Sequence, residues 1–174
     1  MKRFGIAILF GCWAMAGAAQ VAEQSCVGDH SAWLAAHADE MAGTWIDTPV
    51  VGLMVGRPMP PGPPEPIDLT AIPNGFSAIG EEPRRLYELR LTDAPFAIEP
   101  PGGATELARL DREEVPNCAI TDLPHLTASY LLEIDGQMVE GTIVAVVAST
   151  RVIHIWFGLD TGFGRVEQLS RMTR

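Results

Sequence analysis

The chain has 174 residues, with 12 basic and 22 acidic side chains, a formal net charge of −10 and a hydrophobic content of 47%. This acidic balance disfavours nucleic acids and anionic membrane surfaces as partners, because both carry negative charge. The length suits one globular domain with a solvated acidic surface, which leaves cationic partners open.

The first nineteen residues predict a secretory signal peptide. A basic pair precedes an apolar run over 4–18, and the run ends in small residues that suit cleavage near Ala18 or Ala19. The run is short for a membrane span, and no later apolar stretch is long enough to cross a bilayer. We therefore expect a signal peptide over 1–19, a periplasmic or secreted location, and one β-rich domain over 20–174. Loss of the basic pair would leave 10 basic against 22 acidic residues, a net charge of −12.

Two cysteines, Cys26 and Cys118, remain after the signal. Cysteines in an exported chain most often pair, so we expect a disulfide between Cys26 and Cys118. A bridge that closes the long loop between these cysteines would stabilise the folded state by about 4 kcal/mol on the chain-entropy model. Metal-ligating or redox thiols are the alternative, which no Cys-x-x-Cys spacing favours. Lipoprotein processing at Cys12 is a further alternative, disfavoured by the bulky Phe10 and the apolar run that continues past Cys12.

An amphipathic helix is expected over 30–42, where apolar residues recur at every third or fourth position. Asp29 or Ser31 can cap its start. The chain then becomes irregular, and a proline-rich loop is expected over 57–66, because six prolines exclude a helix or a central strand. This loop could be a docking segment, a flap over a site or a stiff surface connection.

From residue 86 onward the sequence predicts β-structure. The segment 86–91 alternates, and a second short extended piece is expected over 94–98. The charged segment 106–114 suits either a short helix or an edge strand. The tail over 163–172 suits a final strand, although its apolar spacing also fits a short helix.

The clearest element is a hairpin around Asp135-Gly136, the preferred pair for a two-residue type I′ turn. This turn pairs Tyr130 with Gly141 and places Val139 on the same apolar face. An aromatic ring over a strand glycine is a common arrangement, so the turn chemistry and the side-chain pattern agree on one register.

A third strand is expected over 152–159, after a tight loop around 149–150. A two- or four-residue loop pairs Ala145 with His154 and makes His154 a titratable group inside an apolar concavity, where it could orient a ligand or transfer a proton. A three-residue loop would move His154 to the opposite face, and a hydrogen-bonded core histidine is the plainer alternative. The candidate ligand-binding residues of the shared face are Tyr130, Val139, His154 and Trp156.

The triplet Gly43-Thr44-Trp45 resembles the Gly-x-Trp signature near the start of lipocalins and related calycin barrels. Here too a helix precedes the signature and a meander of antiparallel strands closes the chain. The resemblance implies an up-and-down barrel with an apolar cavity, in which Trp45 seals the closed end under an arginine of the last strand, Arg165 or Arg171. The proline-rich stretch 49–83 departs from the family where early strands should lie. We therefore expect a mainly β antiparallel meander that forms either a barrel or a strongly curved sheet.

Few other residues suggest chemistry. His30, His37 and Met41 share one helix face and are ligand types that suit copper, but they do not complete a site, so we expect no metal and no cofactor. His125 follows a proline and is expected to be exposed. No nucleophile elbow, phosphate-binding glycine loop or His-Glu-x-x-His motif is present, so no enzyme class is favoured.

The leading hypothesis is an exported protein of the cell envelope that binds a small apolar or amphipathic ligand. The alternative is an envelope accessory protein that docks onto a protein partner through residues 57–66 or through its acidic surface. A small enzyme that uses His154 is the third hypothesis.

Overall fold

The computed structural model describes residues 26, 28–80, 86–93, 119–134 and 136–174. The predicted signal peptide over 1–19, the segments 94–98 and 106–114, and Cys118 lie outside the described residues. In the described ranges, no helix combines the length and the apolar character needed to cross a membrane.

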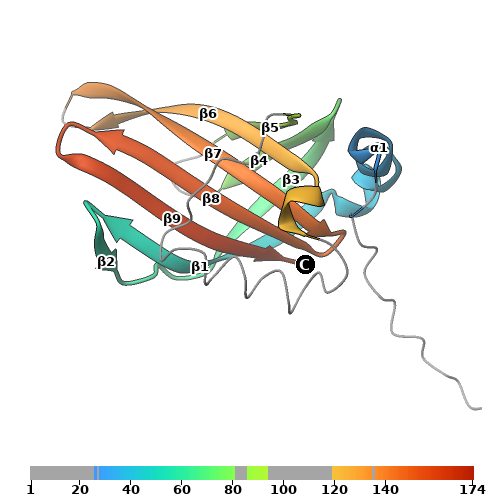
Figure 1. Ribbon diagram of the computed structural model, residues 1–174, viewed down its shortest axis with the longest axis horizontal. Coiled ribbons are helices and arrows are strands. Elements are labelled where there is room, and N and C mark those ends of the chain that lie inside the picture. Colours follow the sequence, from blue (N-terminus) through green and yellow to red (C-terminus); the bar gives the residue numbers. More distant parts are fainter. Residues whose placement is uncertain (1–25, 27, 81–85, 94–118, 135) are drawn as a thin grey trace, which may run out of the picture.

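One antiparallel sheet contains most of the described chain (Figure 1). Its elements are α1 (His30–Met41), β1 (Gly43–Met54), β2 (Arg57–Met59), β3 (Glu65–Ile72), β4 (Gly75–Gly80), β5 (Leu86–Leu91), η1 (Ile120–Asp122), β6 (His125–Ile134), β7 (Gln137–Ser149), β8 (Val152–Thr161) and β9 (Gly164–Thr173). Within the described residues, the eight strands β1 and β3 to β9 pair in chain order, and β9 returns to pair with β1, which closes a barrel. The short β2 extends one edge of β1. The predicted mainly β meander with an N-terminal helix is confirmed.

Helix α1 covers one end of the barrel, opposite the turn between β8 and β9 (Figure 1). Asp29 caps its start, because the Asp29 side chain accepts a hydrogen bond of 2.9 Å from the backbone N–H of Ala32. The helix ends before Gly43, whose φ of +120° is one that other residues rarely adopt. The helix side chains buried against the barrel are Trp33, Leu34 and Met41.

The irregular chain that we expected after Trp45 and over 49–83 is wrong, because β1, β3 and β4 occupy most of that stretch. The prolines fit these strands for local reasons. Pro58 lies in the short β2 at an edge, and Pro66 is the second residue of β3, positions at which a missing N–H is tolerated. Of the predicted proline-rich loop 57–66, only residues 60–64 lie outside strands.

The predicted register of the β6–β7 hairpin is confirmed. Tyr130 pairs with Gly141, and Leu132 pairs with Val139. The ring of Tyr130 lies directly over Gly141, since a Cβ built on that glycine would come within 2.0 Å of Tyr130 Cζ. Tyr130 and Val139 therefore share the face that points into the barrel.

The predicted register of the third strand is wrong by one residue. His154 pairs with Val146 and Trp156 with Val144, because the β7–β8 ladder shifts between Val147 and Ser149. One extra residue in β7 reverses the direction in which every β8 side chain points. The outer face therefore carries His154 and Trp156, and the inner face carries their neighbours Ile155 and Phe157.

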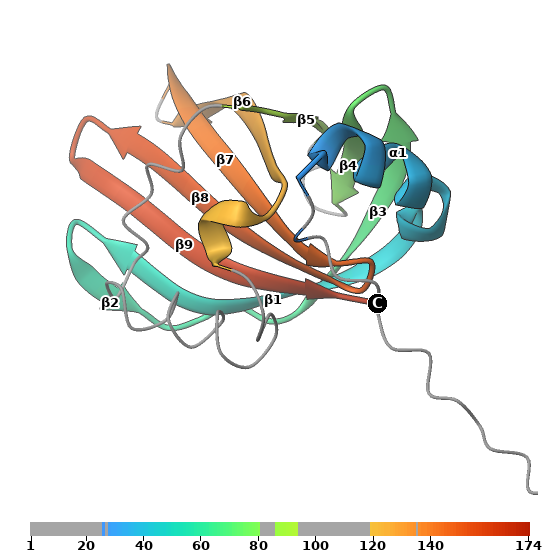
Figure 2. The ribbon, with the colours of Figure 1, turned by 45° about the vertical axis from the view of Figure 1, so that its right-hand side comes forward.

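The core has two parts. The larger part fills the end of the barrel next to α1 and includes Trp45, Leu69, Phe76, Leu126, Ile153 and Met172. The smaller part lies outside the barrel, where η1 crosses the outer face of β7 and β8 (Figure 2). Its buried members are Leu123, Val146 and Ala148, with Cys26, Ile120 and Val152 packed against them.

Candidate functional site

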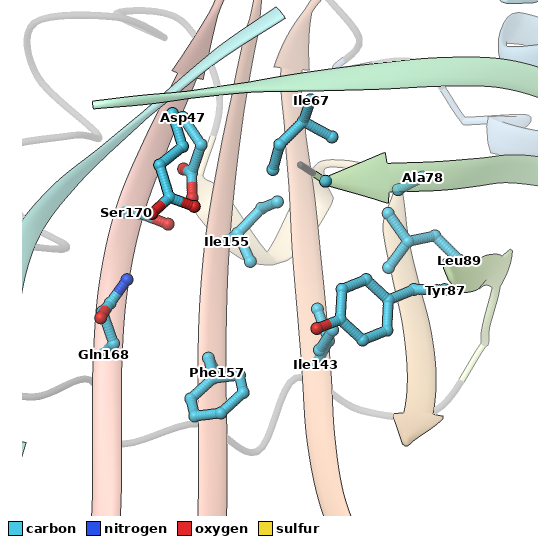
Figure 3. A pocket seen from close by; sticks show the side chains of 12 residues that line it. Asp47, Ile67, Ala78, Tyr87, Leu89, Ile143, Ile155, Phe157, Gln168 and Ser170 are labelled. Atoms are coloured by element: carbon cyan, nitrogen blue, oxygen red, sulfur yellow. The ribbon is translucent and has the colours of Figure 1, made fainter. Parts of the chain in front are cut away.

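The barrel interior contains a cavity of about 160 Å³ beyond the packed layer around Trp45 (Figure 3). Side chains along β1 alternate between the two faces of the strand. Asp47 therefore faces the cavity, two residues after the fully buried Trp45. Every barrel strand except β6 contributes side chains. The lining residues are Asp47, Glu65, Ile67, Ala78, Gly80, Tyr87, Leu89, Ile143, Ile155, Phe157, Gln168 and Ser170.

Aromatic rings form one wall of the cavity. Tyr130 packs edge-on against Tyr87, with 5.6 Å between ring centroids, and stacks on Phe157, with 5.0 Å between centroids and 22° between planes. Both arrangements are favourable for aromatic pairs. Gly141 makes room for this packing, because it leaves the space that Tyr130 occupies.

Polar groups gather on the opposite side. Figure 3 shows Asp47, Ser170 and Gln168 at one side of the cavity and Ala78, Leu89 and Tyr87 at the other. Asp47 and Ser170 are neighbours across the β1–β9 ladder, and the Ser170 side chain forms a hydrogen bond with the Asp47 carboxylate. Within the described part of the chain, the other oxygen of that carboxylate, Oδ1, is buried without a hydrogen-bond partner.

A second carboxylate lies directly opposite the first. Asp47 pairs with Glu65 in the β1–β3 ladder, so both side chains point to the same face. Burial raises the pKa of Asp47 above its ordinary value, the negative charge of Glu65 raises it further, and the hydrogen bond from Ser170 opposes both effects. Like charges directly opposite each other destabilise a sheet. The site thus has unfavourable electrostatics at its polar side.

This arrangement can hold one small molecule by its apolar body and one polar group. A dry cavity of about 150 Å³ lined by apolar side chains is large enough for benzene. The buried Oδ1 of Asp47 offers an acceptor to a hydrogen-bond donor or a cation.

The structure does not bring the four predicted ligand-binding residues together. Tyr130 supports the aromatic wall and Val139 faces inward on the same face, but neither lines the cavity. His154 and Trp156 are buried on the outer face, with exposed fractions of 4% and 8%. The guanidinium of Arg165 lies 5.4 Å from the centroid of Trp156, at the distance of a cation–π contact.

Trp45 lies at the closed end, where its Nε1–H donates a hydrogen bond of 2.8 Å to the carbonyl oxygen of Met41. The expectation that Arg165 or Arg171 covers it is wrong. Arg171 pairs with Thr48, on the face opposite Trp45, and Arg165 lies over Trp156. The arginine at this end is Arg174, whose guanidinium donates to the carbonyl oxygen of Glu40 and lies beside Gly43.

The histidines have structural contacts. His30 Nε2 lies 2.9 Å from the carbonyl oxygen of Asp122, and the ring of His37 packs on Trp33 with 4.6 Å between centroids. The expectation that His125 is exposed is wrong, since its exposed fraction is 7% and burial lowers its pKa. Among the described residues, no three histidine, cysteine or acidic side chains gather where they could hold a metal ion.

The predicted disulfide is not shown. Cys26 packs against Leu123 and its neighbours, and it forms no disulfide with another residue of the described ranges. Cys118 lies outside the described residues. The bridge therefore stays a prediction.

The sequence interpretation missed the polar side of the cavity. Its key residue, Asp47, lies two positions after Trp45 and therefore on the same face of an extended strand. A carboxylate on the core face of a strand would indicate a polar site. This signal can be used only if a strand is predicted to continue past Pro49. Gln168 and Ser170 alternate with charged residues in β9 and carry no comparable signal.

Comparison with known proteins gave no match to a protein-family model, to a curated protein or to a solved structure.

Proposed function

We propose that this protein binds one small, mainly apolar molecule inside its barrel. The observation that carries the proposal is the cavity of about 160 Å³, with apolar and aromatic walls and one polar side. Ligand sites are concave, mainly apolar and equipped with a few polar groups that orient the ligand. The lipocalin-like Gly43-Thr44-Trp45 signature, followed by a closed antiparallel barrel, supports the same proposal.

The volume of the cavity is sufficient for about one aromatic ring with a short substituent. A small probe that fits inside this volume reports on the cavity itself. Toluene is therefore a suitable probe, measured by isothermal titration calorimetry or by ligand-observed NMR.

A cavity-filling variant provides the control. Gly80 lines the cavity, and no described atom lies within 4 Å of a Cβ built on it, so Gly80→Leu would place its side chain in open space. Gly28→Leu, at a position that is equally open but outside the barrel, is the matched control. We expect toluene to bind the wild type and Gly28→Leu but not Gly80→Leu. Equal binding of toluene by all three proteins would contradict the proposal, as would a failure of the wild type to bind either toluene or an aromatic ligand of the same size that carries a polar group.

We further propose that the protein acts outside the cytoplasm, with a disulfide between Cys26 and Cys118. Cys26 packs in the same cluster as Ile120, which lies two residues after Cys118 in the sequence. Mass spectrometry after alkylation, with and without reductant, tests the bridge. Alkylation of both thiols without reductant in protein isolated from the periplasm would exclude it.

A second candidate function is docking onto a protein partner of the envelope. Two exposed apolar side chains at the end of the barrel opposite α1 favour it. Val55, at the tip of the β1–β2 turn, and Phe163, at the β8–β9 turn, are exposed by 55% and 82%. The two turns adjoin, because Val55 N–H donates to the carbonyl oxygen of Arg165 over 2.8 Å. Phe163→Ser with Val55→Ser should abolish capture of such a partner and leave toluene binding intact. Capture that does not depend on these residues would exclude this surface.

A further inference from the structure

We propose that the cavity selects a small organic cation, an amine whose ammonium group binds beside Asp47 and Glu65 while its apolar body lies against Tyr87 and Phe157. This inference rests on the proposed function and names the ligand class of the same site.

The first argument is the uncompensated negative charge. Asp47 and Glu65 lie directly opposite each other on adjacent strands and face the same cavity. Neither forms an ion pair with another residue in the described part of the chain. Two like charges in this position destabilise the sheet, and a cation between them would reverse that effect.

The second argument is the hydrogen-bonding capacity of Asp47. One oxygen of its carboxylate is held by Ser170, and Oδ1 is buried with no partner among the described residues. Buried polar atoms are rarely left in this state, so Oδ1 calls for an explanation. An ammonium group has three donors and no acceptor, which matches a side of the cavity that offers carboxylate oxygens. Gln168 lies on the same side of the cavity and adds a neutral polar side chain (Figure 3).

The third argument is the rest of the lining. Tyr87 and Phe157 present ring surface to the cavity, and aromatic rings attract cations as well as apolar groups. The two carboxylates would repel an anionic ligand. A neutral alcohol could bond to Oδ1 but would leave the repulsion between Asp47 and Glu65 in place. The net charge of −10 also attracts cations toward the protein over long range.

Calorimetry with three ligands of matched shape tests the inference: benzylamine, benzyl alcohol and benzoate at neutral pH. We expect benzylamine to bind the wild type at least about tenfold more tightly than benzyl alcohol, and benzoate not to bind. Asp47→Asn should weaken benzylamine at least about tenfold and change the affinity for benzyl alcohol by less than about threefold.

Asp68→Asn is the matched control, because Asp68 lies on the outer face of the same strand as Glu65 and accepts a hydrogen bond of 2.6 Å from Thr44. It removes one negative charge from the barrel without changing the cavity, so benzylamine should bind it as it binds the wild type. Glu65→Gln provides a second variant if Asp47→Asn does not fold.

The outcomes separate the two proposals. If benzyl alcohol binds as tightly as benzylamine, or if Asp47→Asn and Glu65→Gln keep full affinity for the amine, the cation inference is overturned and the binding function stands. If toluene and all three of these ligands fail to bind, both proposals fail.

Discussion

Asp47 shows how one residue can oppose stability and favour binding. Its carboxylate faces the barrel interior because it follows the buried Trp45 at the two-residue period of a strand. An apolar or amide side chain at this position would avoid the repulsion from Glu65. Binding sites commonly keep such destabilising groups, since the ligand supplies the missing interactions.

Asp47→Asn should therefore stabilise the unliganded protein at neutral pH by about 0.5–2 kcal/mol. Burial raises the pKa of folded Asp47 above 3.8, so at pH values between the unfolded and the folded pKa the folded state holds a proton that the unfolded state releases. Stability is then lost as the pH rises through the raised pKa, and the advantage of the variant should shrink toward pH 4. Urea unfolding of both proteins over a pH series measures this difference.

The groups that face Asp47 support this assignment of the pH dependence. Glu65 faces it from β3, while β9 contributes the uncharged Gln168, Ser170 and Met172. Asp68→Asn, on the outer face, should show no such trend. A variant Asp47→Asn that is less stable than the wild type at every pH would contradict the assignment.

The two tryptophans at the closed end allow a matched comparison. Trp45 Nε1–H donates to the carbonyl oxygen of Met41, whereas Trp33 Nε1 is buried with no partner among the described residues. Trp45→Phe removes a buried hydrogen bond and leaves the Met41 carbonyl oxygen without this donor. It should therefore lower the free energy of unfolding by about 1–3 kcal/mol more than Trp33→Phe does. Chemical denaturation measures both losses. Equal losses would show that the hydrogen bond at the closed end contributes nothing.

Among the elements, the β6–β7 hairpin depends on the contact between Tyr130 and Gly141. Gly141→Ala would place a Cβ about 2 Å from the tyrosine ring, so Tyr130 must move away from Tyr87 and Phe157. We expect a loss of about 1–3 kcal/mol from this overpacking. Thermal unfolding measures it.

Gly80→Ala is the control for Gly141→Ala, because it makes the same change in a strand where no described atom lies within 4 Å of the new Cβ. It should be neutral or stabilising. Equal effects of the two substitutions would mean that Tyr130 adapts without cost.

The elements also show what the sequence could predict. The β6–β7 register followed from Asp135-Gly136 because a two-residue turn fixes the pairing of every residue that follows. The β7–β8 register did not, since β7 and β8 are apolar on both faces near this turn and one extra residue reverses the faces. The β3–β4 hairpin turns at Pro73-Asn74, with Gly75 already paired with Ile72, so the Asn-Gly pair in the sequence does not mark the observed register.

At the scale of the molecule, the cavity exists because the barrel closes. Asp47 and Ser170 are neighbours only through the pairing of β1 with β9, across more than a hundred residues of sequence. Local patterns contain no information on such a contact, so the polar side of the cavity could not be predicted. The closed end could be predicted in part, because α1, Gly43 and Trp45 are adjacent in the chain.

Isoleucine methyl NMR offers the most direct test of the cavity, because one label reports on the inside and the outside of the barrel. Ile67, Ile143 and Ile155 line the cavity, whereas Ile46 and Ile79 are exposed by 44% and 43% on the outer face. A titration with benzylamine or toluene should shift the three inner methyl signals and leave the two outer signals unchanged. Shifts confined to the outer methyl groups, or no shifts with either compound, would contradict a binding cavity inside the barrel.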